Sequence, residues 1–258
     1  MAAAESIFVT GAARGIGLAI VRRFAAAGYT VGAVDINEEQ LAGLKTEVGQ
    51  QVWTAPMDVT DYDAWQRTLG EFVTTTGGRL DILVNNAGLL SAGQFADIPP
   101  ARHKQIVDVN VTGVMYGCHA AFPYLRDTPG ARVLNLCSAS AIYGQPELAS
   151  YSTTKFAVRG LTEALDLEWR DQDIAVSALW PLFVGTAMLA GVTTGSTESL
   201  GIHLTPDDIA NEAWRALHRK SKRPKVHHPV GTQTKLAYYF SQVSPTWMTR
   251  LVNKRLSH

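Results

Sequence analysis

The sequence predicts an α/β protein built on one doubly wound parallel sheet, for three reasons. Short β-type runs alternate with helix-like amphipathic segments from end to end. Strands separated by helices require right-handed crossovers, which give a parallel sheet covered on both faces. The chain has 258 residues, enough for one large domain, and shows no linker, repeat or low-complexity segment. We therefore expect a single domain over residues 1–258.

The alternation starts with a strand and runs through six strands and five helices. Strands are expected at residues 7–10, 30–34, 51–57, 82–85, 132–137 and 174–179. Helices, recognised by apolar residues three or four positions apart, are expected at residues 17–27, 38–47, 61–75, 101–125 and 151–171. Six such strands suit a doubly wound sheet, in which ligands bind at the carboxyl ends of the strands.

Composition excludes several classes of protein. With 46% hydrophobic and 18% charged residues, the chain is too apolar for disorder. Lys plus Arg and Asp plus Glu number 23 each, so no basic field exists to hold nucleic acid. The first residues contain no export signal. Cys118 and Cys137 each lie in an apolar stretch, which favours buried thiols in a reducing, cytoplasmic setting.

A glycine-rich turn follows the first strand and opens the first helix. Gly11, Gly15 and Gly17 have the spacing G-x-x-x-G-x-G, with Arg14 and Ile16 between them. Free backbone N–H groups and the positive end of a helix dipole attract an anion at such a place, and glycines let it approach. The turn therefore predicts a phosphate site, although a glycine-rich turn alone is a weak signal.

An acidic residue at the end of the second strand strengthens this interpretation. Asp35 lies 18 positions after Gly17, where a carboxylate accepts hydrogen bonds from both hydroxyls of an adenosine ribose. The same carboxylate repels a 2′-phosphate, which favours NAD over NADP. Arg14 is the one residue of the turn able to pair with that phosphate, and no basic residue follows Asp35. The other interpretation of Asp35 is an ordinary helix cap.

Tyr151 and Lys155 stand four positions apart on a predicted helix, so they project from one face. A phenol titrates near pH 10 and exchanges protons poorly at neutral pH, unless a nearby cation stabilises its phenolate. Lys155, together with the positive charge of an oxidised nicotinamide, supplies that field. Ser138 follows the fifth strand, where its hydroxyl can hold a substrate oxygen. Without these neighbours, Tyr and Lys at this spacing are usually a solvated surface pair.

Taken together, these motifs resemble the short-chain dehydrogenases/reductases over residues 6 to about 190. The resemblance implies a Rossmann-like fold and adds further site residues. Asp58 and Val59 resemble the adenine-contacting pair, and Asn86, Ala87 and Gly88 resemble the motif that flanks the cofactor. Asn110 corresponds to the Asn that kinks a helix and holds a water in the proton relay, completing a tetrad with Ser138, Tyr151 and Lys155.

The segment after the sixth strand departs from the family. The family often has Pro-Gly there, whereas this chain has Pro181 followed by Leu182. Thr186 still stands where the family's Thr contacts the nicotinamide carboxamide, so the resemblance implies that Pro181 and Thr186 contact the cofactor.

The motifs and the resemblance together predict an oxidoreductase that transfers a hydride between a nicotinamide cofactor, NAD being favoured, and a carbinol carbon. Tyr151 exchanges the hydroxyl proton, Ser138 fixes the oxygen, and Lys155 lowers the pKa of Tyr151 and binds the nicotinamide ribose. The alternatives are an NADPH-dependent carbonyl reductase and a non-catalytic NAD(H)-binding redox sensor. An epimerase or dehydratase is disfavoured because too few residues follow Thr186 for a substrate domain.

The expected substrate is an apolar secondary alcohol or ketone. Residues 181–206 are predicted as a substrate loop, and the residues expected to line the pocket carry hardly any charge: Leu89, Leu90, Ile142, Tyr143, Leu182, Phe183, Met188 and Leu189. No fixed cation for an acidic substrate stands out. A metal is not expected, because His227 and His228 are adjacent and no acidic cluster accompanies them.

Residues 232–258 form an amphipathic carboxyl-terminal tail broken at Pro245. Its apolar residues fall three or four apart, with basic residues interspersed: Leu236, Tyr239, Phe240, Val243, Trp247, Leu251 and Val252, with Lys235, Arg250, Lys254 and Arg255. Such a stripe predicts packing on the domain, a lid or another subunit, with peripheral membrane contact as the alternative. By resemblance, the helices at 101–125 and 151–171 pair across a dyad, so a homodimer or homotetramer is expected.

Overall fold

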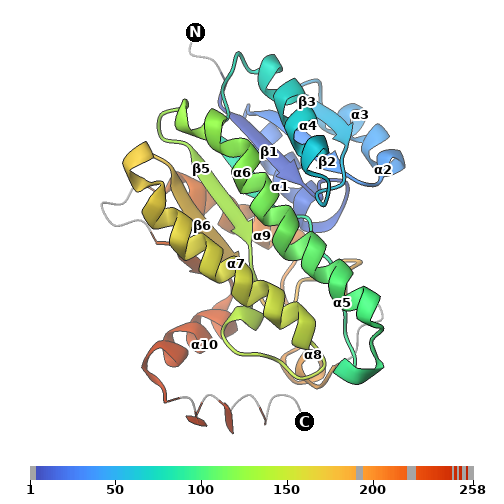
Figure 1. The fold of residues 1–258 in the computed structure, drawn as a ribbon, viewed down its shortest axis with the longest axis vertical. Helices are drawn as coiled ribbons and strands as arrows, with labels where there is room; N and C mark the ends of the chain where they lie inside the picture. The colour runs from blue at the N-terminus through green and yellow to red at the C-terminus, as the bar shows by residue number, and fades with distance from the viewer. Residues whose placement is uncertain are drawn as a thin grey trace.

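The computed structural model describes residues 4–189, 194–219, 225–245, 247–248, 250–251 and 254. Its centre is a seven-stranded sheet in which all neighbours are parallel and the strand order is β3-β2-β1-β4-β5-β6-β7. The strands are β1 Ser6–Thr10, β2 Thr30–Asp35, β3 Val52–Pro56, β4 Ile82–Asn85, β5 Arg132–Leu136, β6 Ala175–Trp180 and β7 His227–Pro229. The chain starts at β1, runs outward to β3 and returns to β4, so the direction of winding reverses between β1 and β4 (Figure 1). The predicted doubly wound parallel sheet is confirmed.

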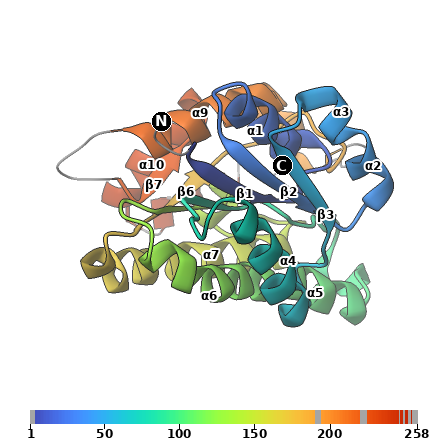
Figure 2. The ribbon, with the colours of Figure 1, turned by 90° about the horizontal axis from the view of Figure 1, so that it is seen from above.

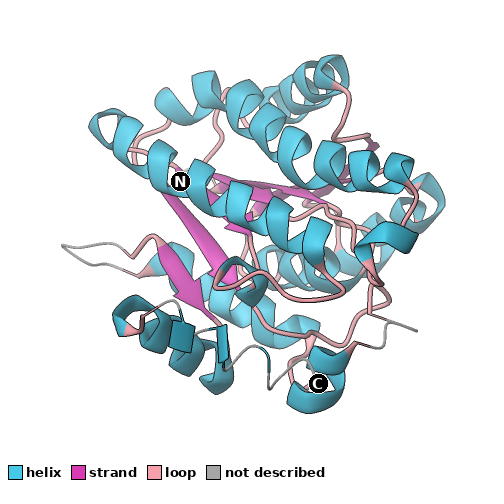
Figure 3. Ribbon diagram, turned by 60° about the horizontal axis from the view of Figure 1, so that its bottom comes forward, coloured by secondary structure: helices cyan, strands magenta, loops and turns pink. Residues whose placement is uncertain are grey.

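Helices cover both faces of this sheet, as Figures 2 and 3 show. On one face α1 packs with α9 over a core that contains Ile7, Phe24 and Ile209. On the other face α4, α6 and α7 cover a core that contains Phe8, Trp65 and Trp180. The helices are α1 Gly15–Ala25, α2 Glu38–Ala42, α3 Leu44–Val48, α4 Tyr62–Thr75, α5 Pro100–Val107, α6 Gly113–Arg126, α7 Ala149–Glu168, α8 Gly195–Leu200, α9 Pro206–His218 and α10 Thr232–Val243.

Several elements differ from the sequence-based prediction. The expected helix 38–47 is two short helices that meet at Gly43, and the expected helix 101–125 is divided into α5 and α6 by a π-turn, Asp108–Thr112. The seventh strand, β7, escaped prediction because it has only three residues. Helix α9 was also missed, although Thr205 and Asp208 form a capping box with Pro206 in the first turn, which is a recognisable start signal.

The carboxyl-terminal tail contacts the domain through a face that the stripe does not include. On α10, Thr234 is buried, and Tyr238 packs edge-on against Trp180 with ring centroids 5.4 Å apart. The predicted stripe points outward, because Leu236 is 73% exposed and Val243 is 82% exposed. The expectation that the stripe packs on its own domain is therefore wrong for these residues. Val252 and Arg255 lie outside the described residues.

Both cysteines are buried free thiols, as their apolar surroundings predicted. Burial raises the pKa of Cys118 to about 12 and that of Cys137 to about 11, so both thiols are protonated at neutral pH. Among the described residues, no helix combines the length and hydropathy that crossing a bilayer requires.

Candidate active site

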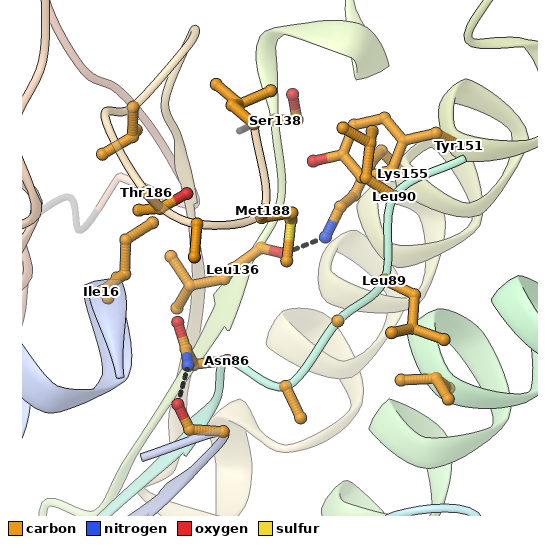
Figure 4. A pocket seen from close by; sticks show the side chains of 18 of the residues that line it. Ile16, Asn86, Leu89, Leu90, Leu136, Ser138, Tyr151, Lys155, Thr186 and Met188 are labelled. Carbon is orange, nitrogen blue, oxygen red and sulfur yellow. Dashed lines mark hydrogen bonds between the residues drawn. The ribbon is translucent and has the colours of Figure 1, made fainter. Parts of the chain in front are cut away.

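A cavity of about 610 Å³ opens at the carboxyl ends of the strands, next to the point between β1 and β4 where the winding reverses. Crevices of α/β sheets hold ligands at this position, because the loops that leave neighbouring strands diverge there. The turn after β1, the loop after β4, the start of α7 and the segment after β6 all line the cavity (Figure 4). One end of it lies against Asp35 and Asp58, and the other against Leu148 and Thr197.

The glycine turn has a backbone that only glycine adopts readily. Gly11 and Gly15 have φ of +63° and +56°. A Cβ on Gly11 would lie 2.8 Å from Cα of Ala87, and one on Gly17 would lie 2.0 Å from the carbonyl oxygen of Gly11. Helix α1 then begins after an exposed Arg14 without any side-chain cap and without an acidic residue in its first turn. The turn therefore fits an anionic group, which the N–H groups of this helix end attract.

Asn86 ties the loop after β4 to the glycine turn. Its side-chain Nδ2 donates to the carbonyl oxygens of Thr10 (2.8 Å) and Gly11 (3.0 Å). In return, the Thr10 hydroxyl accepts from the backbone N–H groups of Asn86 and Ala87, both at 3.0 Å. Gly88 follows, where an added Cβ would lie 3.3 Å from Oδ1 of Asn110. These bonds fix the position of the loop after β4 relative to the glycine turn.

Two carboxylates mark the end of the cavity farthest from α7. Asp35 lies at the end of β2, where Oδ2 accepts from the N–H of Ala13 (3.1 Å) and Oδ1 from that of Asn37 (3.0 Å). This turns the carboxylate toward the glycine turn. Asp58 accepts from the backbone N–H and hydroxyl of Thr60 at 2.9 and 2.8 Å. Both acidic residues line the cavity, as does Val59.

Helix α7 brings Tyr151 and Lys155 to the cavity, opposite Ser138 at the end of β5. The Lys155 amine donates to the carbonyl oxygen of Leu136 (2.7 Å) and lies 5.4 Å from the centre of the Tyr151 ring. The hydroxyl of Ser138 accepts from the N–H of Ser140 (3.1 Å). Figure 4 shows the polar ends of Ser138, Tyr151 and Lys155 in the same part of the cavity. The structure therefore brings these three predicted residues together.

Burial has the largest effect on the pKa values of Tyr151 and Lys155. It raises the pKa of Tyr151 to about 12, an effect that the hydrogen bond with Ser138 partly offsets. It also lowers the pKa of Lys155. The sequence predicted that Lys155 lowers the pKa of Tyr151, whereas in the protein by itself desolvation has the largest effect and raises it.

Asn110 is buried in the π-turn between α5 and α6 and is not among the residues that line the cavity. Its side chain accepts from the N–H of Leu89 (2.7 Å) and donates to the Leu89 carbonyl oxygen (2.8 Å) and to the hydroxyl of Thr154 (3.1 Å). A π-turn widens a helix locally, which agrees with the predicted kink. These bonds of the side chain join the loop after β4 to α7.

Only some of the residues predicted to line the substrate pocket reach the cavity. Leu90 and Phe183 line the cavity, as do Leu89, Leu182, Met188 and Leu189. Ile142 instead packs against the core on the α7 side of the sheet, and Tyr143 lines a separate surface hollow with Phe156. After Ser140 the chain leaves the cavity through the turn Ala139–Ala141 and returns only at Leu148. Residues 190–193 of the predicted substrate loop lie outside the described residues.

The predicted cofactor residues beyond the turn also reach the cavity. Thr186 and Pro181 line it, and a Cβ on Gly15 would lie 3.4 Å from the Thr186 side chain. The lining also includes residues that the sequence did not single out: Ile36, Met57, Arg102, Ser140, Leu148 and Thr197. Arg102 was missed because it lies within a helix, where its guanidinium donates to the Leu90 carbonyl oxygen (2.8 Å) and to Gln105 (2.7 Å).

No group of three or more His, Cys, Asp or Glu side chains that could hold a metal ion occurs in the part of the chain that the structure describes. The Nε2 atom of His227 forms a hydrogen bond with Oε1 of Glu163 at 2.8 Å.

Comparisons with known proteins agree with this geometry. Residues 5–197 match the family model for short chain dehydrogenase. A 3-alpha-(or 20-beta)-hydroxysteroid dehydrogenase of Mycobacterium bovis is 33% identical over 204 residues, which cover 79% of this chain and 78% of that protein. An L-2,3-butanediol dehydrogenase of Corynebacterium glutamicum is 36% identical over 186 residues, 70% of this chain and 72% of that protein. A crystal structure of 3-ketoacyl-(acyl-carrier-protein) reductase from Brucella melitensis, complexed with NADH, matches with a TM-score of 0.82 and 27% identity over 89% of this chain and 98% of that one.

Proposed function

The chain belongs to the short chain dehydrogenase family and is an oxidoreductase, and from this premise we propose that it transfers a hydride between NAD and an apolar secondary alcohol or ketone. One observation carries the proposal: Ser138, Tyr151 and Lys155 meet in the cavity that the glycine turn borders. A non-catalytic redox sensor has no need of a half-buried phenol beside a buried amine.

The cavity fits a nicotinamide dinucleotide. The glycine turn, with Arg14 and Ile16, would hold the pyrophosphate, and Asp35 would accept from the adenosine ribose. Asp58 and Val59 would flank the adenine, whereas Lys155 and Thr186 would hold the nicotinamide end beside Pro181. A solved relative that binds NADH supports this assignment. When bound, the oxidised cofactor supplies the hydride-accepting carbon and a positive charge.

The protein's own residues handle the proton and the substrate oxygen. Ser138 holds the oxygen by a hydrogen bond, and Tyr151 takes the hydroxyl proton during oxidation or returns it during reduction. The positive charges of Lys155 and of the oxidised cofactor both favour the phenolate of Tyr151, which opposes the effect of burial. Asn110 fixes the loop after β4 against α7, so the cavity keeps its shape around these groups.

NAD is favoured over NADP because Asp35 sits at the ribose end with its carboxylate held toward the glycine turn. A 2′-phosphate there meets a negative charge, and an ion pair with Arg14 gains little because Arg14 is exposed to water. The competing proposal, an NADPH-dependent carbonyl reductase, relies on this Arg14.

An apolar substrate is favoured by the wall around the catalytic groups. The side chains there are Leu89, Leu90, Leu148, Phe183, Met188 and Leu189. Relatives named for a hydroxysteroid and for a butanediol act on alcohols of different size, so they support the reaction class and leave the size of the alcohol to experiment.

We also propose that the chain forms a homodimer or homotetramer through α6 and α7. Met115, Phe156 and Leu167 leave large apolar surfaces exposed on these two helices. Light scattering tests this, and a monomer at micromolar concentration contradicts it.

With two free buried thiols, the protein suits a reducing compartment such as the cytoplasm.

A turnover screen tests the proposed function. Purified protein is given a panel of hydrophobic secondary alcohols with NAD⁺ or NADP⁺, and the matching ketones with NADH or NADPH, and the change in reduced nicotinamide is followed. We expect turnover with NAD(H) on at least one apolar pair. Turnover only with NADP(H) supports the reductase alternative, and binding of NADH without any turnover supports the sensor.

A further inference from the structure

Glu147, four positions before Tyr151, has a backbone conformation that side chains disfavour. Its φ is +62°, in the left-handed region that glycine occupies most readily. Within the described residues, Asp173 is the other non-glycine residue with positive φ, at +57°. Such a conformation persists only where the surrounding contacts hold it, so the contacts of Glu147 must outweigh its backbone cost.

Those contacts join three segments that are distant in sequence. The carbonyl oxygen of Glu147 accepts from the N–H of Gly93 at 2.8 Å. Its carboxylate Oε2 accepts from the N–H of Gly195, the first residue of α8, at 3.2 Å. Glu147 itself belongs to the segment that leads into α7, and α8 lies beside the start of α7 (Figure 1).

Each joined segment contributes to the substrate end of the cavity. Leu90 lies just before Gly93, Leu148 follows Glu147, and Thr197 lies two residues after Gly195; all three line the cavity. Thr197 is fixed to the start of α8 by a capping box, because its hydroxyl accepts from the Thr194 N–H (2.8 Å) and its own N–H donates to the Thr194 hydroxyl (3.2 Å). A shift of Gly195 therefore carries Thr197 with it.

We propose that Glu147 is a positioning residue for the substrate: its carboxylate holds α8 against the entrance of the catalytic helix and so fixes the wall that an apolar alcohol or ketone packs against. The inference rests on the proposed function, since it takes this end of the cavity to hold such a substrate. Glu147 does not line the cavity, and it acts through Leu148 and Thr197.

The two hydrogen bonds of Glu147 allow its side chain to be tested alone. Glu147→Gly removes the carboxylate, keeps the backbone bond to Gly93 and suits a positive φ. Relief of strain opposes both the lost hydrogen bond and the added freedom of the unfolded chain, so the melting temperature should stay within about 3 °C of the wild type. Glu147→Gln keeps an acceptor oxygen at the same place.

Asp173 supplies a matched control. Its carboxylate also accepts from a backbone N–H, that of Gly130 at 2.8 Å, and its backbone is also left-handed. It lies before β6, at the amino end of the sheet and outside the cavity. Asp173→Gly therefore makes the same chemical change away from the substrate.

The first measurement is amide hydrogen exchange in the free protein, read at Gly195 and Gly93. In Glu147→Gly, exchange of the Gly195 amide should rise about tenfold, as expected for a lost hydrogen bond to a charged group, while Gly93 stays unchanged. Glu147→Gln should change Gly195 by less than about threefold. Asp173→Gly should change neither amide. An unaltered Gly195 amide in Glu147→Gly overturns the proposal.

The second measurement is steady-state kinetics with an apolar alcohol found by the screen. Glu147→Gly should raise the KM for the alcohol about fivefold or more, with kcat and the KM for the dinucleotide within about twofold. Glu147→Gln and Asp173→Gly should match the wild type. Faster exchange at Gly195 with an unchanged KM for the alcohol shows a merely structural contact and overturns the proposal. If the wild type turns over no apolar alcohol or ketone with NAD(H), the proposed function fails, and the exchange data still decide whether Glu147 holds α8.

Discussion

The end of the cavity proposed to hold the dinucleotide and the end proposed to hold the substrate are built in different ways. The dinucleotide end consists of strand ends, the first turn of α1 and the bonds of Asn86, all attached directly to the sheet. The substrate end consists of loops after β4, β5 and β6 and a helix of six residues, joined by a few contacts such as that between Glu147 and Gly195. With the proposed function, the sheet would fix the cofactor chemistry, whereas the loops would set which substrate is oxidised or reduced.

The largest effect should come from Tyr151, the residue proposed to exchange the proton with the substrate. Tyr151→Phe removes the hydroxyl that exchanges the proton, so kcat should fall about a thousandfold. The ring remains and the glycine turn is untouched, so the affinity for NADH should stay within about twofold. Turnover assays and fluorescence titration of NADH check both numbers. Near-normal turnover in this variant would falsify the assignment of Tyr151.

A glycine of the turn tests the rigidity of the dinucleotide end. The Cβ of Gly17→Ala would lie 2.0 Å from the Gly11 carbonyl oxygen, so the turn must shift. We expect affinity for NADH to fall about a hundredfold and the free energy of unfolding to drop by about 1–3 kcal/mol, measured by titration and by chemical denaturation.

Gly70 provides the control for that substitution. It lies within α4, where an added Cβ would make ordinary contact, 3.5 Å from the Tyr124 hydroxyl. Gly70→Ala should leave NADH binding unchanged and stabilise the protein by about 0.5–1 kcal/mol. If Gly17→Ala behaves like Gly70→Ala, the turn is not the phosphate site.

A smaller effect concerns the choice of dinucleotide. Asp35→Ser removes the charge at the ribose end, so the ratio of kcat/KM for NAD⁺ over NADP⁺ should fall about tenfold or more, which corresponds to about 1.4 kcal/mol. Asp58→Asn serves as the comparison, because the Asp58 carboxylate faces Thr60. It should alter both dinucleotides alike. An unchanged ratio in Asp35→Ser would remove the physical basis for preferring NAD.

The difference between the two ends of the cavity also explains which site residues could be predicted from the sequence. The proposed dinucleotide end was predictable because its residue types follow from local requirements. A positive φ favours glycine at positions 11 and 15, and the ribose hydroxyls favour an acidic residue where β2 ends at Asp35. Tyr151 and Lys155 were predictable because helical periodicity alone puts them on one face. Family resemblance supplied Asn110 and Asp58, which no local pattern identifies.

The substrate end was less predictable because its geometry depends on tertiary contacts. Ile142 and Tyr143 have the right chemistry for an apolar wall, but the turn at Ala139–Ala141 leads them elsewhere. Nothing in the sequence around Glu147 indicates a left-handed backbone, because contacts with Gly93 and Gly195 impose it. The start of α9, by contrast, has a local signal in the sequence, the capping box of Thr205 and Asp208.

The most direct test of the central claim is the ionisation of Tyr151 itself, followed as the tyrosinate absorbance difference between the wild type and Tyr151→Phe, with and without saturating NAD⁺. Burial sets the pKa of Tyr151 at about 12 in the free protein, so no ionisation of this residue should be seen there up to about pH 10. With NAD⁺, the added positive charge should bring the ionisation to or below pH 10. An apparent pKa that is the same in both titrations would contradict the claim that Tyr151 becomes the catalytic base through the charges gathered around it.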